Sequence, residues 1–405
     1  MKIKDNLKRE ANSYLVVPKM LKFCRKHKLE GNFRYQYIQS IEKFAEKSEE
    51  NLEEVNKWLD EAVMEGIKYI YIGKIEFVKD DFWYKSEVFW KDFMNKFNIK
   101  SNVHINDCKS YDELTYGSIN INIENKKVQK VNLIISLRTA DATKSYEHPY
   151  IEGYPIFVQI DIDKKNIVVR LKSKSKLFRV KDDNGIKVID IERKIGFDKL
   201  AYQVVKKISN DVGFNTIDNR EFHELIKSSY YKILDEITKT PDEIAHIINK
   251  SEQLNSQYID DIIKETTIDE EVYKEKMKED LNMLLEKFIS ISYPNKDIFK
   301  GAYAFPIKLI ATDSEDTKVE ETSSNLQPLQ TKAAFYDHKR IIQAEKKCDG
   351  MKLAVNRNDT KYYGRYPFIV KCDFVSSKGF GRIRFDEYVE EADIQNVLSR
   401  VISTL

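Results

Sequence analysis

The residues with the clearest chemical potential are the basic side chains between positions 164 and 187. Nine lysines and arginines lie in this stretch against two aspartates, which gives a local net charge of +7. In a strand, side chains at alternate positions share one face at intervals of about 6.6–7 Å. Such a row of cations could follow the phosphates of a nucleic acid, holding them by an attraction that salt weakens. The predicted nucleic-acid-binding residues are Arg170, Lys172, Lys174, Lys176, Arg179 and Lys181.

The same lysines have a structural interpretation. Edge strands often carry lysine to block pairing with other chains, and a solvated strand face is usually charged. The overall composition does not decide the matter, because 68 basic side chains are balanced by 66 acidic ones for a net charge of +2. Attraction to a polyanion therefore has to come from local clustering of charge.

A metal-dependent nuclease is the main catalytic alternative. Restriction-type nucleases use an Asp followed on the next strand by Glu-x-Lys, so that two carboxylates hold Mg²⁺ and the lysine orients the attacking water. Asp183 followed by Glu192 and Lys194 matches this spacing. Glu-x-Lys is frequent by chance in a chain rich in both residues, and here it falls where the strand should end. A second candidate carboxylate cluster consists of Asp161, Asp163 and Asp373.

The sequence contains no pattern that supports another kind of site. Six histidines and four cysteines are dispersed, so neither a zinc site nor a disulfide framework is expected. The motifs of phosphate-binding loops, Rossmann folds, serine hydrolases and zinc proteases do not occur. Apart from Mg²⁺ under the nuclease alternative, we expect no cofactor.

The composition is that of a globular protein outside the membrane. Of 405 residues, 41% are hydrophobic and 33% are charged. No apolar run approaches the roughly 20 residues that cross a bilayer, and the N-terminus lacks the apolar core of a secretory signal. These features predict a cytoplasmic protein without a membrane partner.

The elements that must position these residues alternate between helical and β-rich segments. Asn51 with Glu54 has the spacing of a helix cap, and Asn125-Lys126 and Asn184-Gly185 are expected in hairpin turns. The polar residues 311–332 are predicted to form a mobile loop. We predict a helical segment over 1–66 with the element order of a winged helix, a β-rich α+β domain over 67–195, a helical block over 196–295 and a C-terminal α+β domain over 296–405 that ends in a helix.

The two β-rich segments contain similar hairpins. Gly153-Tyr154-Pro155 is echoed by Gly364-Arg365-Tyr366-Pro367, and each is followed by an apolar run that carries arginine, at 168–171 and at 382–385. Duplication would explain the echo, and so would the suitability of Tyr-Pro for starting a strand. The sequence thus predicts an α+β fold whose β-rich parts are paralogous or share one sheet.

These observations favour a protein that binds nucleic acid without catalysing a reaction. On compositional grounds we expect a subunit or effector of a prokaryotic or viral complex with protein partners, and host–phage conflict (antiviral defence) is one such setting. The alternatives are the metal-dependent nuclease and a protein–protein scaffold that works through the amphipathic helices of 196–292. DNA and RNA are not distinguished.

Overall fold

The structure is a computed structural model, and it describes residues 1–9, 14–66, 68–266, 269–301, 303–312, 317–324, 326–357 and 367–405. The chain forms two compact units. Within the described residues, unit 1 comprises 1–223 and 374–402, and unit 2 comprises 224–357, 367–373 and 403–405. Helices and antiparallel strands make up the fold, so the predicted α+β class is confirmed. None of the helices found in these ranges is long and apolar enough to cross a membrane.

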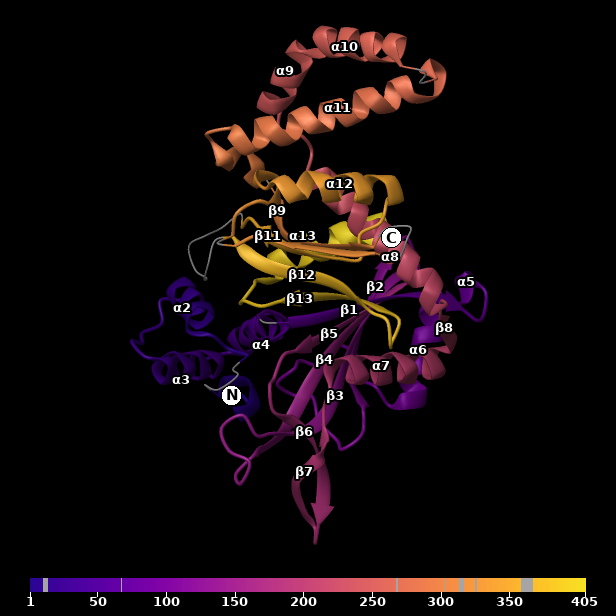
Figure 1. The fold of residues 1–405 in the computed structure, drawn as a ribbon. Helices are drawn as coiled ribbons and strands as arrows, with labels where there is room; N and C mark the ends of the chain where they lie inside the picture. Colours follow the sequence, from indigo (N-terminus) through magenta and orange to yellow (C-terminus); the bar gives the residue numbers. More distant parts are fainter. Residues whose placement is uncertain are drawn as a thin grey trace. The chain divides into compact units, whose positions relative to one another are not determined.

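Unit 1 is built around a sheet with helices on both faces. The N-terminal helices lie on one side of the strands, and α6 and α7 lie on the other (Figure 1). The helices are α1 (Asp5–Lys8), α2 (Val17–Lys26), α3 (Arg34–Ala45), α4 (Glu49–Met64), α5 (Asp81–Tyr84), α6 (Glu87–Phe97), α7 (Phe197–Ile208), the π-helical turn η1 (Ser209–Gly213), the start of α8 (Asn219–Ile237) and most of α13 (Glu391–Thr404). The strands are β1 (Lys68–Phe77), β2 (Thr115–Glu124), β3 (Lys127–Asp141), β4 (Tyr150–Asp161), β5 (Asn166–Lys172), β6 (Leu177–Asp183), β7 (Ile186–Lys194), β8 (Phe214–Thr216) and β13 (Phe380–Phe385).

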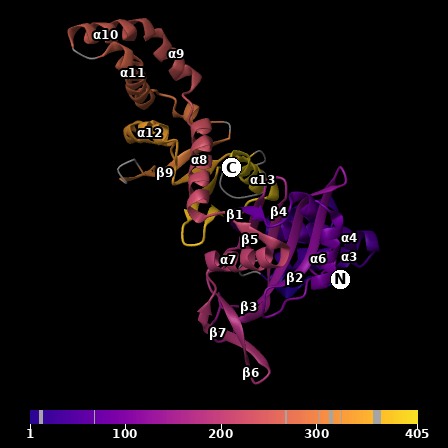
Figure 2. The ribbon, with the colours of Figure 1, turned by 90° about the vertical axis from the view of Figure 1, so that its right-hand side faces the viewer.

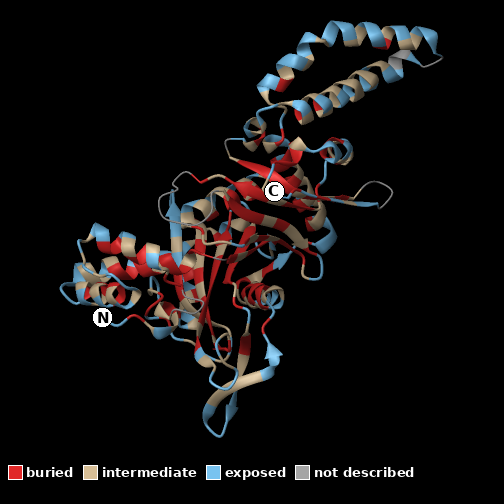
Figure 3. Cartoon of the chain, turned by 60° about the vertical axis from the view of Figure 1, so that its left-hand side comes forward, coloured by how far each residue is buried: buried red, intermediate tan, exposed pale blue. Residues whose placement is uncertain are grey.

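The longest strand, β3, organises this sheet. It pairs antiparallel with β4 from Lys130 to Asp141, and on its other side it pairs first with β2 and then with β6. The strand order in unit 1 is β13-β1-β5-β4-β3-β6-β7, with β8 beside the end of β1. The hairpin of β6 and β7 extends beyond the other strands of this unit (Figure 2), and its tip is exposed (Figure 3).

Two hairpin turns lie where the sequence predicts them. Asn125 and Lys126 adopt positive φ angles of 51° and 62° between β2 and β3. Asn184 and Gly185 do the same between β6 and β7, with 54° and 83°. A two-residue turn of this type requires the left-handed conformation at both central positions, which Asn and Gly tolerate best.

The two faces of the sheet bury separate hydrophobic cores. On one face, residues such as Leu133 pack with Leu200 of α7. On the other face, Ile134 and Phe157 pack beneath the N-terminal helices, which contribute residues such as Leu59. Because successive side chains of a strand point to opposite faces, strands covered on both sides need apolar residues at nearly every position.

The position of β1 corrects the winged-helix interpretation of the N-terminal segment. β1 is an interior strand, with Ile70 opposite Ile383 of β13 on one side and Arg170 of β5 on the other. A wing would instead be an exposed hairpin beside the helices. Four helices precede β1, and the order of elements does not reveal which strands become their neighbours.

The second strands of the two similar hairpins lie in one sheet. β5 and β13 flank β1, which agrees with the predicted shared sheet. Their arginines are not equivalent, however, because Arg170 lies opposite Ile70 whereas Arg382 lies opposite Tyr71. Adjacent positions on a strand point to opposite faces. The start of the second hairpin, at 364–366, lies outside the described residues.

Unit 2 combines a small sheet with long helices. β9 pairs with β10 and β11, and β11 pairs with β12. Residues such as Phe305 and Ile369 form its core. Its elements are the remainder of α8, α9 (Asp242–Lys250), α10 (Glu252–Glu265), α11 (Glu270–Ser292), the 3-10 turns η2 (Lys296–Lys300) and η3 (Leu329–Thr331), α12 (Ala333–Glu345), β9 (Ala304–Thr312), β10 (Lys318–Thr322), β11 (Gly350–Val355) and β12 (Phe368–Val375).

The prediction of a loop over 311–332 needs correction. Its described part contains β10, in which Thr322 is paired with Lys308 of β9, and the turn η3. Leu329 in that turn is fully buried. Sheet pairing and one apolar anchor were enough to order a segment whose composition is otherwise polar.

Candidate functional site

Three of the six predicted basic residues lie inside unit 1 and not on its surface. β5 pairs with both β1 and β4, and it ends at Lys172. Arg170, Lys172 and Lys174 are only 6%, 7% and 4% exposed. These residues therefore form neither an exposed row for phosphates nor the charged edge of a sheet. Alternation along the chain indicates which residues share a strand face, but it does not indicate what covers that face.

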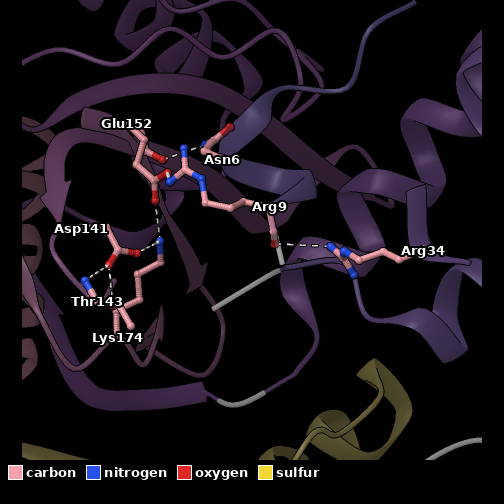
Figure 4. A network of polar contacts seen from close by, with 8 residues as sticks. Asn6, Arg9, Arg34, Asp141, Thr143, Glu152 and Lys174 are labelled. Atoms are coloured by element: carbon pink, nitrogen blue, oxygen red, sulfur yellow. Dashed lines mark hydrogen bonds and ion pairs between the residues drawn. The ribbon is translucent and has the colours of Figure 1, made fainter. Parts of the chain in front are cut away.

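Carboxylates of unit 1 pair with two of these cations. Lys174 Nζ lies 2.8 Å from Asp141 Oδ2 and 2.5 Å from Glu152 Oε1, and Arg9 approaches Glu152 at 2.6 Å (Figure 4). Arg170 Nη1 lies 2.9 and 2.7 Å from the two carboxylate oxygens of Glu391. Burying a charge is costly unless it is paired and hydrogen-bonded. These contacts therefore give the basic run a role within the fold.

The surroundings of Lys172 change the pKa of its ammonium group strongly. Burial, followed by the charge of Lys174, lowers the pKa of its ammonium group to about 7. Lys68, which lies opposite on β1, has its pKa lowered well below the usual value by burial and then by the nearby cations. Both ammonium groups lie over the ring of Tyr14, at 4.8 and 5.4 Å from its centroid. Lys172 therefore titrates near neutral pH.

The remaining predicted binding residues lie nearer the surface but do not form a row. Lys176 is half-buried, with its ammonium 4.6 Å from the ring centroid of Tyr146. Arg179 is half-buried and donates to Gln203 Oε1 at 3.0 Å. Lys181 is exposed on β6. Of the six residues, Lys181 alone falls in the exposed class.

The predicted nuclease residues do not converge. Asp183 ends β6 beside the turn, opposite Ile186. Glu192 lies six residues after Ile186 on β7, which places it roughly 20 Å along the strand. Glu192 and Lys194 are both exposed. The spacing in sequence matched a known arrangement, but the hairpin holds the two carboxylates at different ends.

The three aspartates of the second predicted cluster each contact a different neighbouring group. Asp161 Oδ1 accepts the backbone N–H of Lys164 at 2.9 Å, and Asp163 pairs with Lys85 at 2.6 Å. In unit 2, Asp373 pairs with its neighbour Lys371 at 2.9 Å. Across the described ranges, no group of three histidine, cysteine or acidic side chains is placed to hold a metal ion.

A groove on the face of unit 1 that carries the N-terminal helices is the strongest candidate site. It encloses about 840 Å³ and is lined by α4, the start of α13, residues 102–104 and the strands β2 to β5. Ligand pockets commonly enclose about 300–1,000 Å³. Ile134 and Phe157 supply apolar surface, and the other lining residues are largely polar. The volume and the mixed lining both suit a ligand with apolar faces and polar edges.

A row of amide side chains crosses this groove. Asn120 of β2, Asn132 of β3 and Gln159 of β4 lie directly opposite one another in the sheet. Gln159 Nε2 donates to Asn132 Oδ1 at 2.9 Å, and Asn120 Nδ2 donates to Asn102 Oδ1 at 2.7 Å. Each amide has two donor hydrogens and an acceptor oxygen. The row can therefore bind donors and acceptors of a ligand alike.

His104 connects the groove wall to α4. Its Nδ1 lies 2.6 Å from Asp60 Oδ2, and its Nε2 lies 3.0 Å from Glu53 Oε2. Burial acts to lower the pKa of the ring, but the hydrogen bonds and charges of the two carboxylates outweigh it and raise the pKa above its ordinary value. The protonated ring donates from both nitrogens. This contact fixes residues 102–104 at the groove.

A smaller concavity on the same sheet face, here called the cationic pocket, collects positive charge. It encloses about 340 Å³, and its lining includes Lys4, Lys109 and Arg138. Arg138 is six residues after Asn132 on β3, and both point to the same face because alternate residues do. No acidic side chain is among the residues described as lining this pocket.

The segment 98–111 borders both sites and is fixed at several points. Ile105 and Cys108 are buried beneath the N-terminal helices. Ile105 N–H donates to Asp60 Oδ1 at 2.8 Å, and Lys4 Nζ donates to the Cys108 carbonyl at 2.6 Å. A third hollow, of about 710 Å³, shares His104 with the groove and Lys109 with the cationic pocket. The three hollows belong to one surface region.

Sequence reasoning missed this region almost entirely. Arg170 is the single groove residue among those predicted to bind or catalyse. One signal was present, because the run Ile119-Asn120-Ile121-Asn122-Ile123 alternates and so indicates a strand with one polar face. The amides that extend the row come from other strands, and periodicity does not reveal which strands are neighbours.

No protein-family model matches the chain, and comparison with curated proteins and with solved structures gave no match.

Proposed function

We propose that unit 1 binds nucleic acid in single-stranded form, along the sheet face that contains the groove and the cationic pocket. The main support is that Asn132 and Gln159 share one face of the sheet with Arg138, around which Lys4 and Lys109 also gather. Asn132 and Arg138 are roughly 20 Å apart along β3. An extended polymer with polar bases and anionic linkages would contact both sites, whereas a small neutral ligand would contact one.

The amide row suits bases that are not engaged in a duplex. Asn and Gln recognise base edges because each presents a donor and an acceptor side by side. Such edges are open in single strands, which is why sequence-reading proteins of this kind favour loops and unpaired ends. Ile134, which is partly exposed in the groove, offers apolar surface to the face of a base. The groove therefore provides for both the edges and the faces of bases.

The distribution of charge favours the attraction of phosphates to the cationic pocket and not to the groove. In the groove, Lys57 pairs with Glu53 at 3.2 Å and Arg170 pairs with Glu391 at 2.7 Å. Each groove cation is thus matched by a carboxylate. The cationic pocket has three basic side chains in its lining, so phosphates would be attracted there in a salt-dependent manner.

The proposal keeps the predicted partner and moves its site. Arg170 remains as a groove residue, whereas Lys172 and Lys174 act within the fold. The proposal, like the hypothesis from the sequence, involves binding without catalysis. Membership of a larger complex, a role in antiviral defence and the choice between DNA and RNA stay predictions.

The test is binding of labelled single- and double-stranded DNA and RNA to the full chain across a salt series, with and without Mg²⁺. Single strands should bind more tightly than duplexes, the logarithm of affinity should fall as salt rises, and the strands should stay intact. Asn132→Leu and Gln159→Met remove amides at similar volume. Each should weaken binding by at least about fivefold, because a lost base contact is worth roughly 1 kcal/mol or more.

Lys199→Met is the matched control, because Lys199 is an exposed lysine of α7, on the opposite face of the same sheet and outside both sites. Affinity that survives both amide substitutions, or that falls equally in the control, would count against the assigned site. Shortened strands only with Mg²⁺ would favour the nuclease instead. The absence of any binding at low salt would favour the scaffold.

A further inference from the structure

The cationic pocket is small. Its volume of about 340 Å³ lies at the lower end of the range of about 300–1,000 Å³ for ligand pockets. A continuous strand passing through would need an open channel of greater length. The pocket is therefore better suited to the end of a strand than to its middle.

The basic side chains of the pocket outnumber the carboxylates that pair with them. Arg138 Nη1 lies 2.8 Å from Asp112 Oδ1, and Asp112 Oδ2 lies 2.8 Å from Lys187. Lys187 also pairs with Asp182 at 3.0 Å, so these two cations are balanced by two carboxylates, and the excess charge of the pocket comes from Lys4 and Lys109. Lys4 is partly buried and donates to a backbone carbonyl, and Lys109 is exposed. A ligand with two negative charges would balance the excess, and a terminal phosphate carries about that charge at neutral pH.

Two serine hydroxyls and a glycine form the bottom of the pocket, where phosphate oxygens could be bound. Ser136 is only 4% exposed, and Ser110 lies beside it over Gly153. A Cβ atom at residue 153 would come within 2.9 Å of Ser110 Oγ and 3.7 Å of Ser136 Oγ. The absence of a side chain at Gly153 therefore leaves space beside both hydroxyls, which line the pocket. Serine hydroxyls and basic side chains are common donors to phosphate oxygens.

An aromatic ring stands beside these donors. Tyr111 lines the pocket and is 48% exposed. Its carbonyl accepts the backbone N–H of Arg138 at 2.6 Å, which fixes the tyrosine next to the cations. Aromatic side chains bind unpaired bases by stacking, with little regard to sequence.

We propose that the cationic pocket receives a terminal, phosphorylated nucleotide. Lys4, Lys109 and Arg138 bind the phosphate, Ser110 and Ser136 donate to its oxygens, and Tyr111 stacks on the base. The phosphate monoester is the feature recognised, whether it ends a strand or belongs to a free mononucleotide. Recognition of a strand end rests on the proposed function, whereas recognition of the free mononucleotide does not.

The test compares oligonucleotides that end in a 5′-phosphate, a 3′-phosphate or only hydroxyls, each labelled at the opposite end, on the full chain. Nucleoside monophosphates, unphosphorylated nucleosides and inorganic phosphate serve as competitors. One of the two phosphorylated ends should bind about tenfold more tightly than the hydroxyl end, because a hydrogen-bonded charge is worth roughly 1.4 kcal/mol or more. Monophosphates should compete, and nucleosides should not.

Two variants link the effect to the pocket. Lys109→Met removes an exposed cation, and Gly153→Ala narrows the floor; both should reduce the phosphate preference to less than about threefold. Lys199→Met, at an exposed position of α7, should leave the preference intact. Thermal melting shows whether Gly153→Ala still folds, and Lys109→Met does not depend on that result because its side chain is exposed.

The outcomes separate this inference from the proposed function. Strands that bind equally with and without terminal phosphate would overturn the inference and leave the proposed function standing. Monophosphates that bind while strands do not would support the pocket and remove the proposed function. A preference unchanged in Lys109→Met and Gly153→Ala would place the phosphate elsewhere and overturn the inference.

Discussion

Lys174 is a single residue on which a large part of the stability of unit 1 depends. It lies between Asp141 and Glu152, and all three side chains are almost completely buried. Lys174→Met would leave two buried carboxylates without their shared cation. We expect the free energy of unfolding to fall by about 3–5 kcal/mol, as measured by urea denaturation.

The comparison for this prediction is a variant that removes the carboxylates as well. Asp141→Asn with Glu152→Gln and Lys174→Met removes all three buried charges and takes the carboxylate of Glu152 away from Arg9, whose side chain is 19% exposed, so it should recover part of the loss. If the triple variant were less stable than Lys174→Met alone, the shared charge would not be the cause. Lys181→Met, at an exposed position, should change stability little.

Lys172 gives the stability of the protein a dependence on pH. In the folded state burial lowers the pKa of Lys172 to about 7, whereas an unfolded lysine has a pKa of about 10.4. Between these values the unfolded state binds more protons, so this residue makes stability rise from pH 7 towards pH 10. Lys172→Met removes the titrating group, and thermal melting should then show a smaller rise over that interval. Parallel curves for the two proteins would contradict this origin.

At the scale of elements, the hairpin of β6 and β7 depends on its turn. Gly185 has a φ angle of 83°, and a Cβ atom there would meet nothing within 4 Å. Gly185→Ala therefore tests backbone strain alone, with an expected cost of about 1–2 kcal/mol. Because the hairpin tip is exposed, hydrogen exchange should accelerate in β6 and β7 and remain unchanged in β3.

Asn184→Gly provides the opposite change in the same turn. Asn184 has a φ angle of 54°, which glycine adopts without strain. Exchange in β6 and β7 should be equal to or slower than in the parent protein. Faster exchange in Asn184→Gly than in Gly185→Ala would mean that turn strain does not control the hairpin.

The elements that could be predicted are those fixed by local chemistry. Both predicted hairpin turns were found, because positive φ angles leave a clear mark on residue choice. The start of α4 was placed one turn too late, since Ser48 and not Asn51 is its cap, with Ser48 Oγ accepting the Asn51 N–H at 3.1 Å. When two residues that could cap a helix lie within one turn of each other, the sequence alone does not show which of them accepts the backbone N–H.

The candidate site was predicted far less well than the elements. The basic run indicated charge correctly, but partners from distant segments, such as Glu391 for Arg170, decide whether that charge reaches the surface. The amide row joins Asn120, Asn132 and Gln159 across three strands. Their alignment depends on register between strands, and no single segment contains that information.

At the scale of the whole molecule, unit 1 depends on residues far apart in the chain. Residues 374–402 supply β13 beside β1, and they supply Glu391, which pairs with Arg170. A fragment of residues 1–223 lacks both, so β1 would become an exposed edge and Arg170 would be left without this partner. We expect the fragment to lose cooperative unfolding, as measured by near-UV circular dichroism during thermal melting.

Joining residues 374–402 to residue 223 through a long glycine–serine linker should restore cooperative unfolding, because it returns the missing strand and carboxylate. The linker alone, without these residues, serves as the control. A fragment of 1–223 that melts cooperatively at the temperature of the joined protein would show that β13 and Glu391 are dispensable.

The described part of unit 1 is formed by two segments that are far apart in the chain, and this affects its folding during translation. About 160 residues are synthesised between residue 223 and the end of β13 at Phe385, which at 5–20 residues per second takes roughly 8–32 s. Throughout that interval β1 has no β13 beside it, and its unpaired edge is open to other chains. The nascent protein therefore has a window in which a ribosome-associated chaperone would find a defined strand to shield.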